Sequence, residues 1–360
     1  MVRRVLVVGA GIGGLCLAHG LRQAGIAVTI LERDSGVRTT HGLRLRLDAE
    51  GIGALVWCLP PELVEQVRAA SSLVPVLRGA VLDHQLGTLF AWGGDSPPPE
   101  RASVVVNYAA LREVMHTGLA DTVEFGRQVV RVDHKGDSVC AYLADGGVET
   151  ADVLVGADGI DSVVRQHLLP EAEIADTGLY AITGHATLDP DRLPEEIRRG
   201  SCSIVGPDGL TLNLALGRDN AQWTLIGPLE TFDLEKLHDT ASRLVAGWHP
   251  AVARLVAQSD AAGTFAYPLR AALPVPPWPT TRITLLGDAV HANVPIGGSG
   301  ATVTLRDAAL LTDSLVSGGT DPIGALADYE EQMREYGFES AVRSLHHAED
   351  VFRAYIPALG

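Results

Sequence analysis

Three glycines and one glutamate near the N-terminus have the types and spacing of a dinucleotide site. The motif Gly9-x-Gly11-x-x-Gly14 directly follows the apolar run Val5–Val8. The first glycine would permit a tight turn, the second would let the backbone approach a pyrophosphate, and the third would let a helix pack closely on a strand. The N-terminus of that helix would offer oriented N–H donors to the phosphates. Glu32 ends the next apolar segment and can accept hydrogen bonds from both hydroxyls of an adenosine ribose, which argues against a 2′-phosphate there.

A second glycine-containing segment, residues 156–165 (GADGIDSVVR), follows the apolar strand Val153–Val155. Its small residues would allow close backbone approach, and Asp158 could orient either a backbone turn or a ligand hydroxyl. Taken alone, the segment fits a surface turn equally well.

A third segment joins a carboxylate to a glycine-rich helix start. Gly287-Asp288-Ala289-x-His291 follows the apolar strand Ile283–Leu286 and continues with Pro295, Gly297, Gly298 and Gly300. A carboxylate at the C-terminal end of a strand, before such a helix start, suits a polyol together with a phosphate or carbonyl. We interpret His291 as a structural residue and not as a base. The sequence contains no HxxxH or HExxH pattern, so we expect no metal site and name no catalytic residue.

The elements that would position these motifs indicate an α/β protein. Val5–Val8, a helix over Leu15–Ala24 and a strand over Ala27–Leu31 form a βαβ unit, with Gly25 as the C-terminal cap of the helix. Residues 178–230 contain short alternating runs separated by turn residues, which predict a mostly antiparallel sheet. Further helices are expected over Ala110–Leu119, Leu234–Gln258, Ala301–Leu315 and Pro322–Tyr355, strand pairing over 123–143, and an extended connection over 268–281.

This order predicts a Rossmann-like domain into which a second domain is inserted. We expect residues 1–75, 100–170 and 280–360 to form the nucleotide-binding domain, including the C-terminal helix. Residues 76–99 and 171–279 would then form the substrate domain.

Composition excludes several classes of protein. The chain has 360 residues and a net charge of −16, which argues against a nucleic-acid partner. Its four cysteines contain no CxxC pair, so neither a disulfide framework nor a zinc site is expected, and Cys16 should be a small core residue. No run is long enough to span a membrane and no cleavage site follows the first apolar run, so we expect a cytoplasmic protein.

The three motifs, in this order and at these distances, resemble the single-component flavin monooxygenases of the para-hydroxybenzoate hydroxylase type. The resemblance covers both ends and the connector of the chain, while residues 170–280 share only the strand-rich character. It implies FAD as the bound cofactor and NADPH or NADH as the transient electron donor. It also implies a reaction in which O2 adds to the C4a carbon of the flavin and the resulting hydroperoxide transfers one oxygen atom to the substrate.

The resemblance also assigns roles to residues of this chain. Glu32 would take the adenosine ribose, Arg33 would lie beside the adenine, and Asp288 would take the ribityl hydroxyls. The backbone from Pro295 to Gly300 would face the flavin ring, and the segment around Asp158 would lie near both FAD and NAD(P)H. The expected cofactor-binding residues are therefore Gly9, Gly11, Gly14, Glu32, Arg33, Arg44, Arg112, Asp158, Gly287, Asp288, Pro295, Gly298 and Gly300.

The sequence leaves the roles of Arg44 and Arg112 open, because the first allows two interpretations and the second lies where the chain departs from the family pattern. Arg44 or Arg46 occupies the stretch in which relatives contact the flavin or its linker, although either could equally lie on a solvated strand face. Relatives often show an arginine near position 110, with leucine three residues later, and that arginine contacts FAD. Here Tyr108 stands in the arginine position, and tyrosine cannot supply the forked cation. Arg112, one helical turn later, is the expected substitute.

The resemblance implies that this enzyme inserts oxygen into an aromatic, polycyclic or polyketide-like molecule, by hydroxylation, epoxidation or Baeyer–Villiger insertion. Two alternatives remain: a flavin oxidoreductase that does not insert oxygen, such as a reductase of prenyl double bonds, and a non-catalytic FAD-binding protein. The pocket should lie between the flavin and the middle sheet, and each candidate lining residue could instead be plain core. The candidates are Trp92, Leu214, Trp223, Phe265, Tyr267 and Pro268.

Overall fold

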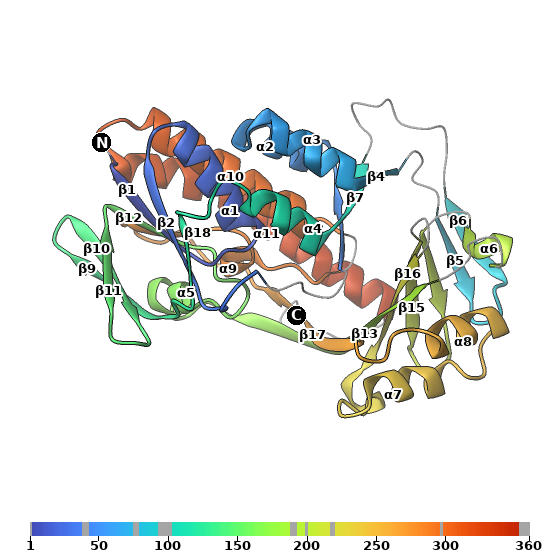
Figure 1. The fold of residues 1–360 in the computed structure, drawn as a ribbon. Helices are drawn as coiled ribbons and strands as arrows, with labels where there is room; N and C mark the ends of the chain where they lie inside the picture. Colours follow the sequence, from blue (N-terminus) through green and yellow to red (C-terminus); the bar gives the residue numbers. More distant parts are fainter. Residues whose placement is uncertain are drawn as a thin grey trace.

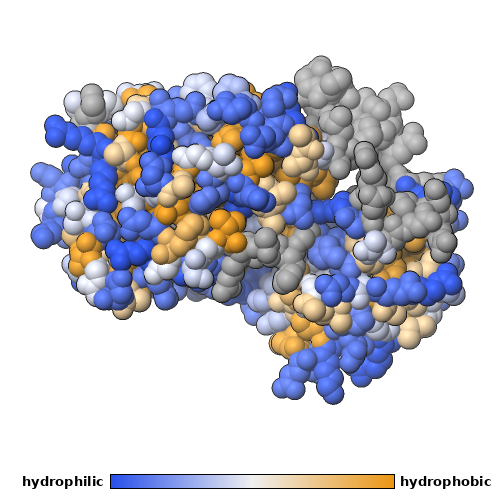
Figure 2. Space-filling model, viewed as in Figure 1, coloured by the Kyte–Doolittle hydropathy of each residue, from blue (hydrophilic) through white to orange (hydrophobic). Residues whose placement is uncertain are grey.

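The structure is a computed structural model. It describes residues 2–37, 43–74, 79–92, 103–187, 193–198, 201–216, 220–295 and 298–352. Two lobes lie side by side: one contains a parallel sheet covered by helices, and the other contains a large, mostly antiparallel sheet (Figure 1). In the same orientation, hydrophilic residues cover most of the visible face (Figure 2).

The first lobe is built on a five-stranded parallel sheet in the order β18-β12-β1-β2-β8. Strands β1, β12 and β18 are buried almost throughout, as their nearly continuous apolar sequences predict. Their bounds are Arg4–Val8 (β1), Ala27–Glu32 (β2), Val123–Phe125 (β8), Val153–Gly156 (β12) and Ile283–Leu285 (β18). The three sequence motifs follow β1, β12 and β18, which are neighbours, so their carboxyl ends meet at one edge of the sheet.

Helices cover this sheet and one another. Helix α1 packs against α10 because its glycines leave room for the partner: a Cβ atom at Gly20 would lie 2.6 Å from Oγ1 of Thr312. The helices are α1 (Ile12–Gln23), α2 (Ala49–Cys58), α3 (Pro61–Ala70), α4 (Tyr108–His116), α5 (Val163–Leu168), α9 (Asp288–His291), α10 (Gly300–Ser317) and α11 (Pro322–Phe352). Cys16 is buried in α1, as expected. The predicted end of the last helix, Tyr355, lies outside the described residues.

Two three-stranded sheets join the lobe. One has the order β3-β7-β4, from Arg44–Leu47, Ser103–Asn107 and Ser71–Val74. The other has the order β11-β10-β9, from Val148–Ala151, Ser138–Leu143 and Val129–Lys135.

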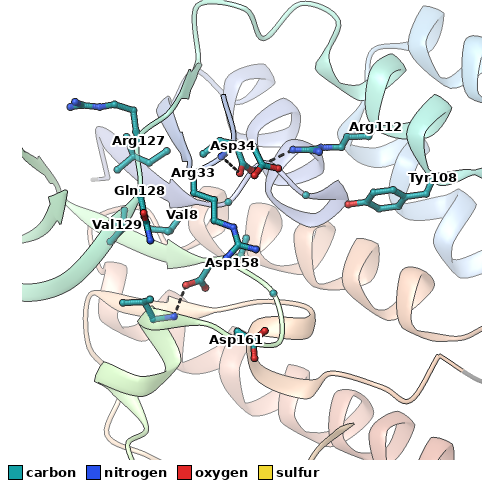
Figure 3. A pocket seen from close by; sticks show the side chains of 17 residues that line it. Val8, Arg33, Asp34, Tyr108, Arg112, Arg127, Gln128, Val129, Asp158 and Asp161 are labelled. Carbon is teal, nitrogen blue, oxygen red and sulfur yellow. Dashed lines mark hydrogen bonds and ion pairs between the residues drawn. The ribbon is translucent and has the colours of Figure 1, made fainter. Parts of the chain in front are cut away.

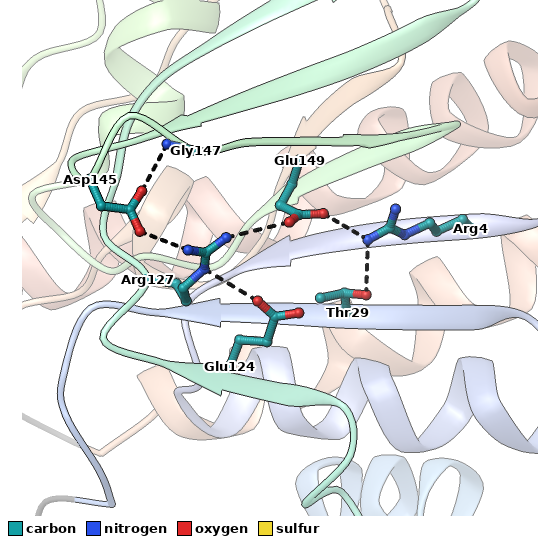
Figure 4. Close-up of polar contacts among 7 residues, drawn as sticks. All are labelled: Arg4, Thr29, Glu124, Arg127, Asp145, Gly147 and Glu149. Atoms are coloured by element: carbon teal, nitrogen blue, oxygen red, sulfur yellow. Dashed lines mark hydrogen bonds and ion pairs between the residues drawn. The ribbon is translucent and has the colours of Figure 1, made fainter.

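Ion pairs of Arg127 connect this second sheet to the parallel sheet. Its guanidinium pairs with Glu124, Asp145 and Glu149, and Glu149 also pairs with Arg4 of β1 (Figure 4). One arginine thus joins three carboxylates from separate strands and turns.

The second lobe contains a seven-stranded sheet in the order β17-β13-β16-β15-β14-β5-β6. Its strands are β5 (Gly79–Asp83), β6 (Thr88–Trp92), β13 (Ile174–Thr187), β14 (Ser201–Val205), β15 (Thr211–Leu216), β16 (Asn220–Pro228) and β17 (Phe265–Ala272). The short helices α6 (Glu195–Arg198), α7 (Leu237–Leu244) and α8 (Pro250–Ala257) belong to the same part of the chain. One face of this sheet packs on α7 and α8 around Trp223, Val245 and Trp248. The mixed α/β fold class is confirmed, while the expected domain boundaries stay a prediction.

Several expected elements differ in their bounds. The single helix expected over Leu234–Gln258 is two helices, because Gly247 and Pro250 interrupt the helical backbone between them. The strand pairing expected over 123–143 is divided, since β8 joins the parallel sheet whereas β9 and β10 form a hairpin. The connection over 268–281 begins as a regular strand, because residues up to Ala272 pair with β13.

Candidate cofactor site

The glycine turn after β1 has the geometry that its sequence predicts. Gly9 adopts φ +105°, and a Cβ atom there would lie 2.4 Å from the carbonyl oxygen of Ala157. A Cβ at Gly14 would lie 2.2 Å from the carbonyl oxygen of Gly9, so helix and turn touch. A Cβ at Gly11 would meet no atom within 4 Å. Gly9 and Gly14 therefore allow close backbone packing, whereas Gly11 borders open space.

That open space is a recess of about 280 Å³ between β1, β2, α4 and the turn after β12. Its lining includes Gly9, Gly11, Glu32, Arg33, Asp34, Tyr108, Arg112, Arg127, Gln128, Val129, Asp158 and Asp161 (Figure 3). The recess brings together residues of the first two sequence motifs. An unfilled space beside a glycine turn at a helix N-terminus is the arrangement that a pyrophosphate requires.

Glu32 sits at the wall of the recess and is only 7% exposed. One carboxylate oxygen accepts a hydrogen bond from the Ala10 N–H at 2.7 Å, and the other accepts one from the Asp34 N–H at 3.0 Å. The oxygen bound by the Asp34 N–H keeps a free acceptor position, so it can still accept a bond from a ribose hydroxyl.

Arg112 links the glycine turn to this carboxylate. Its Nε donates to the Ala10 carbonyl at 2.8 Å, and its terminal nitrogen lies 3.4 Å from Glu32, with both side chains buried. Arg112 thus reaches the recess from α4, and its role as a substitute for the missing arginine stays a prediction.

Tyr108, at the start of α4, also lines the recess. Burial raises the pKa of its phenol, and the carboxylates of Asp288 and Glu32 act in the same direction, while Arg112 opposes them. The phenol is therefore a neutral hydrogen-bond donor near both carboxylates. Arg33 is exposed and extends toward the side of Asp158 and Asp161 (Figure 3).

Asp158 lines the recess, and its carboxylate also holds the backbone of its own turn. Its carboxylate accepts from the Ser162 hydroxyl at 2.5 Å and from the Val163 N–H at 2.8 Å, which holds the turn before α5. Burial raises the pKa of this carboxyl against the lowering effect of these hydrogen bonds. Arg165 then donates to the Ala289 carbonyl at 3.0 Å and so connects the second motif to the third.

The third motif presents a carboxylate without a protein partner. Gly287 adopts φ +61°, and its N–H donates to Asp307 at 2.7 Å. Asp288 makes no hydrogen bond or ion pair within the described residues, and its side chain is exposed to solvent. Desolvation by neighbouring protein atoms still raises the pKa of the Asp288 carboxyl, and His291 opposes the increase. A carboxylate in this setting is available to ligand hydroxyl groups.

His291 lies behind this carboxylate in the protein interior. Its Nε2 is 2.7 Å from Asp307, and a Cβ at Gly337 would lie 2.3 Å from its ring. Burial alone would lower the pKa of His291, but the charge and hydrogen bond of Asp307 outweigh it and raise the pKa. This geometry supports the structural interpretation of His291.

The two arginines of β3 have different surroundings. Arg44 donates to the Leu216 carbonyl at 3.1 Å and to the side chain of Asn220, so it joins β3 to the second lobe. Arg46 lies beside Gly298, and its buried Nε has no partner in the described residues. Of the two, Arg46 is therefore placed next to the glycine-rich loop. Pro295, Gly298 and Gly300 lead into α10, with Pro295 and Gly298 exposed, and Gly297 lies outside the described residues.

The candidate substrate residues divide between the two faces of the large sheet. Leu214 and Trp223 are buried in the core against α7 and α8, which is the face away from α11. The strand register puts Pro268 on that same face, opposite Tyr180. Tyr267 lies on the other face, where it stacks on Phe265 with ring centroids 5.9 Å apart. Trp92 ends β6, and its side chain lies outside the described residues.

The sequence interpretation overlooked the polar residues that alternate with Leu214 and Trp223. Asn213 directly precedes Leu214, and Thr224 directly follows Trp223. Because successive side chains of a strand alternate, both point to the opposite face. The alternation of β15 and β16 was the signal that could have identified them.

The parallel sheet carries a glycine turn suited to a pyrophosphate and a carboxylate, Glu32, suited to ribose hydroxyls. A second carboxylate, Asp288, follows β18. Together these features define an FAD-binding protein of the Rossmann type. Residues 109–340 match the "FAD binding domain" family, and residues 7–42 match the "NAD(P)-binding Rossmann-like domain" family. A solved structure from Photorhabdus luminescens, assigned by inference as an FAD-containing monooxygenase, is 33% identical. The alignment covers 98% of this chain and 99% of that one, with a TM-score of 0.85. The chain therefore belongs to the FAD-binding monooxygenase family, and FAD is its cofactor.

Two further similarities are informative. The structure of Klebsiella pneumoniae HpxO complexed with FAD and uric acid shares the fold, with a TM-score of 0.82, 23% identity, and coverage of 97% of this chain and 89% of that one. A dual O-methyltransferase/FAD-dependent monooxygenase from Cercospora beticola is 30% identical over 92% of this chain and 44% of its own length. The chain thus spans about half the length of the first curated relatives it matches.

The described residues contain no group of histidine, cysteine, aspartate and glutamate side chains that could hold a metal ion. Within the same ranges, none of the helices has the length and apolar character needed to cross a membrane.

Proposed function

We propose that this chain is an FAD-dependent monooxygenase. It would use NADPH or NADH and O2 to insert one oxygen atom into an aromatic, polycyclic or polyketide-like molecule. The observation that carries the proposal is the convergence of three motifs at one sheet edge, where the unpartnered Asp288 lies beyond the recess that Glu32 and Gly11 line. The bound flavin would accept electrons from the nicotinamide and supply the oxygen chemistry.

The protein's own residues then serve for binding and positioning. Gly11 leaves space for the pyrophosphate, Glu32 accepts the ribose hydroxyls, and Asp288 accepts hydroxyls of the ribityl chain. Among the described residues we assign no catalytic acid or base, because the buried His291 is already held by Asp307. Exclusion of water from the flavin would be the main further task of the protein.

The form of oxygen insertion is proposed from the relatives. The Cercospora beticola relative joins a monooxygenase to an O-methyltransferase in one protein, and methyl transfer to oxygen needs a hydroxyl group. This supports hydroxylation over epoxidation or Baeyer–Villiger insertion. A cytoplasmic location and the lack of a nucleic-acid partner stay predictions.

The test begins with the absorbance spectrum of the purified protein, followed by anaerobic addition of NADPH or NADH. We expect a flavin spectrum that is bleached by the nicotinamide, and incorporation of label from ¹⁸O2 into an aromatic acceptor. Bleaching without incorporation into any acceptor would favour an oxidoreductase without oxygen insertion. A flavin that neither nucleotide reduces, with or without an aromatic compound present, would identify a non-catalytic FAD-binding protein.

A further inference from the structure

One face of the large sheet carries a row of polar side chains across neighbouring strands. The register pairs Thr183 with Thr224, Thr224 with Asn213, and Asn213 with Ser203. At one end of the row Phe265 of β17 lies next to Thr183, because these two residues pair across the strands. Four polar residues therefore lie side by side on a single face, next to an aromatic pair.

The neighbouring rows show which way this face points. On one side of the row, Ala181 and Ile226 pack with Val294 of the glycine-rich loop and with Leu345 of α11. On the other side, the Gln222 side chain accepts a hydrogen bond from the Arg44 N–H at 3.1 Å. The polar row thus lies between two contacts with the FAD-binding lobe, on the side of the loop expected to face the flavin.

The hydrogen bonds within the row leave one group unmatched. Thr183 and Thr224 bond to each other at 3.0 Å, and both are buried. The Ser203 hydroxyl donates to Oδ1 of Asn213 at 2.7 Å, and these two residues are only half-buried. The amide NH2 of Asn213 has no hydrogen-bond partner within the described residues. In this orientation the NH2 group points away from Ser203 and is available as a donor.

We propose that the Asn213 NH2 group donates a hydrogen bond to a carbonyl or phenolic oxygen on the ring system of the substrate. Asn213 is then a specificity-determining residue. This inference rests on the proposed monooxygenase function and narrows its substrate class to oxygen-bearing aromatic molecules. The stacked rings of Phe265 and Tyr267 offer a flat apolar contact for the same ring system.

Physical chemistry favours this assignment over a purely solvated amide. Small-molecule pockets are mostly apolar, with a few placed polar groups that fix orientation. A site built to hydrogen-bond a substrate oxygen discriminates strongly against the analogue that lacks it, because its own polar group would remain unpaired. Asn213, hydrogen-bonded to Ser203 and flanked by the apolar row of Ala181 and Ile226, has this character.

The experiment uses oxidised, FAD-loaded protein and two matched pairs of probes: fluorenone with fluorene, and 1-naphthol with naphthalene. Binding is followed by perturbation of the flavin absorbance. The first pair tests a carbonyl oxygen and the second a hydroxyl oxygen. We compare wild type with Asn213→Asp, which keeps the shape and the Ser203 bond, and with Asn213→Leu. Gln332→Glu, an amide-to-carboxylate change on the exposed side of α11, is the control.

We expect an oxygenated probe to bind wild type more tightly than its hydrocarbon partner. Asn213→Leu should weaken either oxygenated probe roughly tenfold, and Asn213→Asp should weaken fluorenone, which has no hydrogen to donate to the new carboxylate. The hydrocarbons should be unaffected, and Gln332→Glu should behave as wild type. The proposal is overturned if neither oxygenated probe binds, if the hydrocarbons bind equally well, or if the variants bind every probe like wild type. Flavin occupancy and thermal midpoint establish that the variants are folded. Flavin reduction by NADPH or NADH, measured without probes, reports separately on the proposed function.

Discussion

The imidazole Nε2 of His291 lies 2.7 Å from the Asp307 carboxylate, and both side chains are almost completely buried. The same carboxylate accepts hydrogen bonds from the Gly287 N–H at 2.7 Å and from the Tyr336 hydroxyl at 2.6 Å. Asp307 therefore holds the backbone turn before Asp288 and the imidazole after it. Because Asp307 holds the turn on both sides of Asp288, the Asp288 carboxylate is not needed to hold it.

This ion pair should make stability dependent on pH. The pKa of His291 is raised in the folded protein, since burial, which lowers it, is outweighed by Asp307, with a further contribution from Asp288. Tyr336 stays neutral because its own pKa is also raised. The stabilising contribution is fully present below the unfolded histidine pKa of about 6.5 and is lost as pH rises through the folded value.

Wild type should therefore lose thermal stability on going from slightly acidic to alkaline pH more steeply than His291→Gln does. Thermal midpoints measured across that range, with FAD loading matched between the two proteins, check this. Parallel pH profiles for wild type and variant would contradict a protonated His291.

Local sequence patterns were sufficient for the FAD-binding unit and insufficient for the substrate face. Gly9, Gly14 and Glu32 could be interpreted because one βαβ unit fixes their relative positions over a short stretch of chain. Trp223 was a misleading candidate for the substrate pocket. A large aromatic side chain can line a pocket or fill the core, and its size does not show which face of the strand is covered by helices. That assignment depends on α7 and α8, which follow later in the chain. The pairing of Arg112 with Ala10 likewise joins residues that no local pattern relates.

Glu32 should contribute directly to FAD affinity. Glu32→Ala removes the carboxylate that would bind the ribose hydroxyls and also the acceptor for the Ala10 N–H. We expect FAD binding to weaken by about 1–3 kcal/mol. Titration of apoprotein with FAD, followed by flavin fluorescence, measures the change. Glu339→Gln, which disturbs only the exposed pair with Arg343 on α11, should bind FAD as wild type does. Equal affinities of Glu32→Ala and wild type would contradict the assignment.

Arg112 should matter more for FAD binding than Tyr108 does. Arg112→Met leaves the buried Glu32 carboxylate without its cation and the Ala10 carbonyl without its donor, so we expect FAD affinity to fall at least roughly tenfold. Tyr108→Phe removes one neutral hydroxyl and should cost only a fewfold change. The same FAD titration ranks the two variants. A larger loss for Tyr108→Phe would show that the phenol, and not Arg112, has taken over the role of the missing arginine.

Asp288→Ala should lower the fraction of protein that carries flavin. The carboxylate makes no hydrogen bond within the described residues, so its removal should disturb the fold little while depriving the ribityl chain of an acceptor. The ratio of flavin to protein absorbance after purification, together with the thermal midpoint of the apoprotein, separates these effects. A variant that retains full flavin and full turnover would reduce the third motif to a structural turn.

His291→Ala should reduce turnover far less than the roughly 10²–10⁴-fold expected from loss of a general acid or base. Its imidazole is engaged by Asp307 and packed against Gly337, and it makes no contact that would place it at a reacting atom. The substitution leaves Asp307 buried with fewer partners, so weaker FAD binding and lower stability are expected. For this reason the quantity to measure is turnover per bound flavin, with occupancy taken from the absorbance spectrum. His291→Gln, which can still donate to Asp307, should retain more flavin than His291→Ala at similar turnover per flavin. A thousandfold collapse at unchanged occupancy would instead make His291 a proton-transfer residue, and the site would then contain the acid–base group that its geometry argues against.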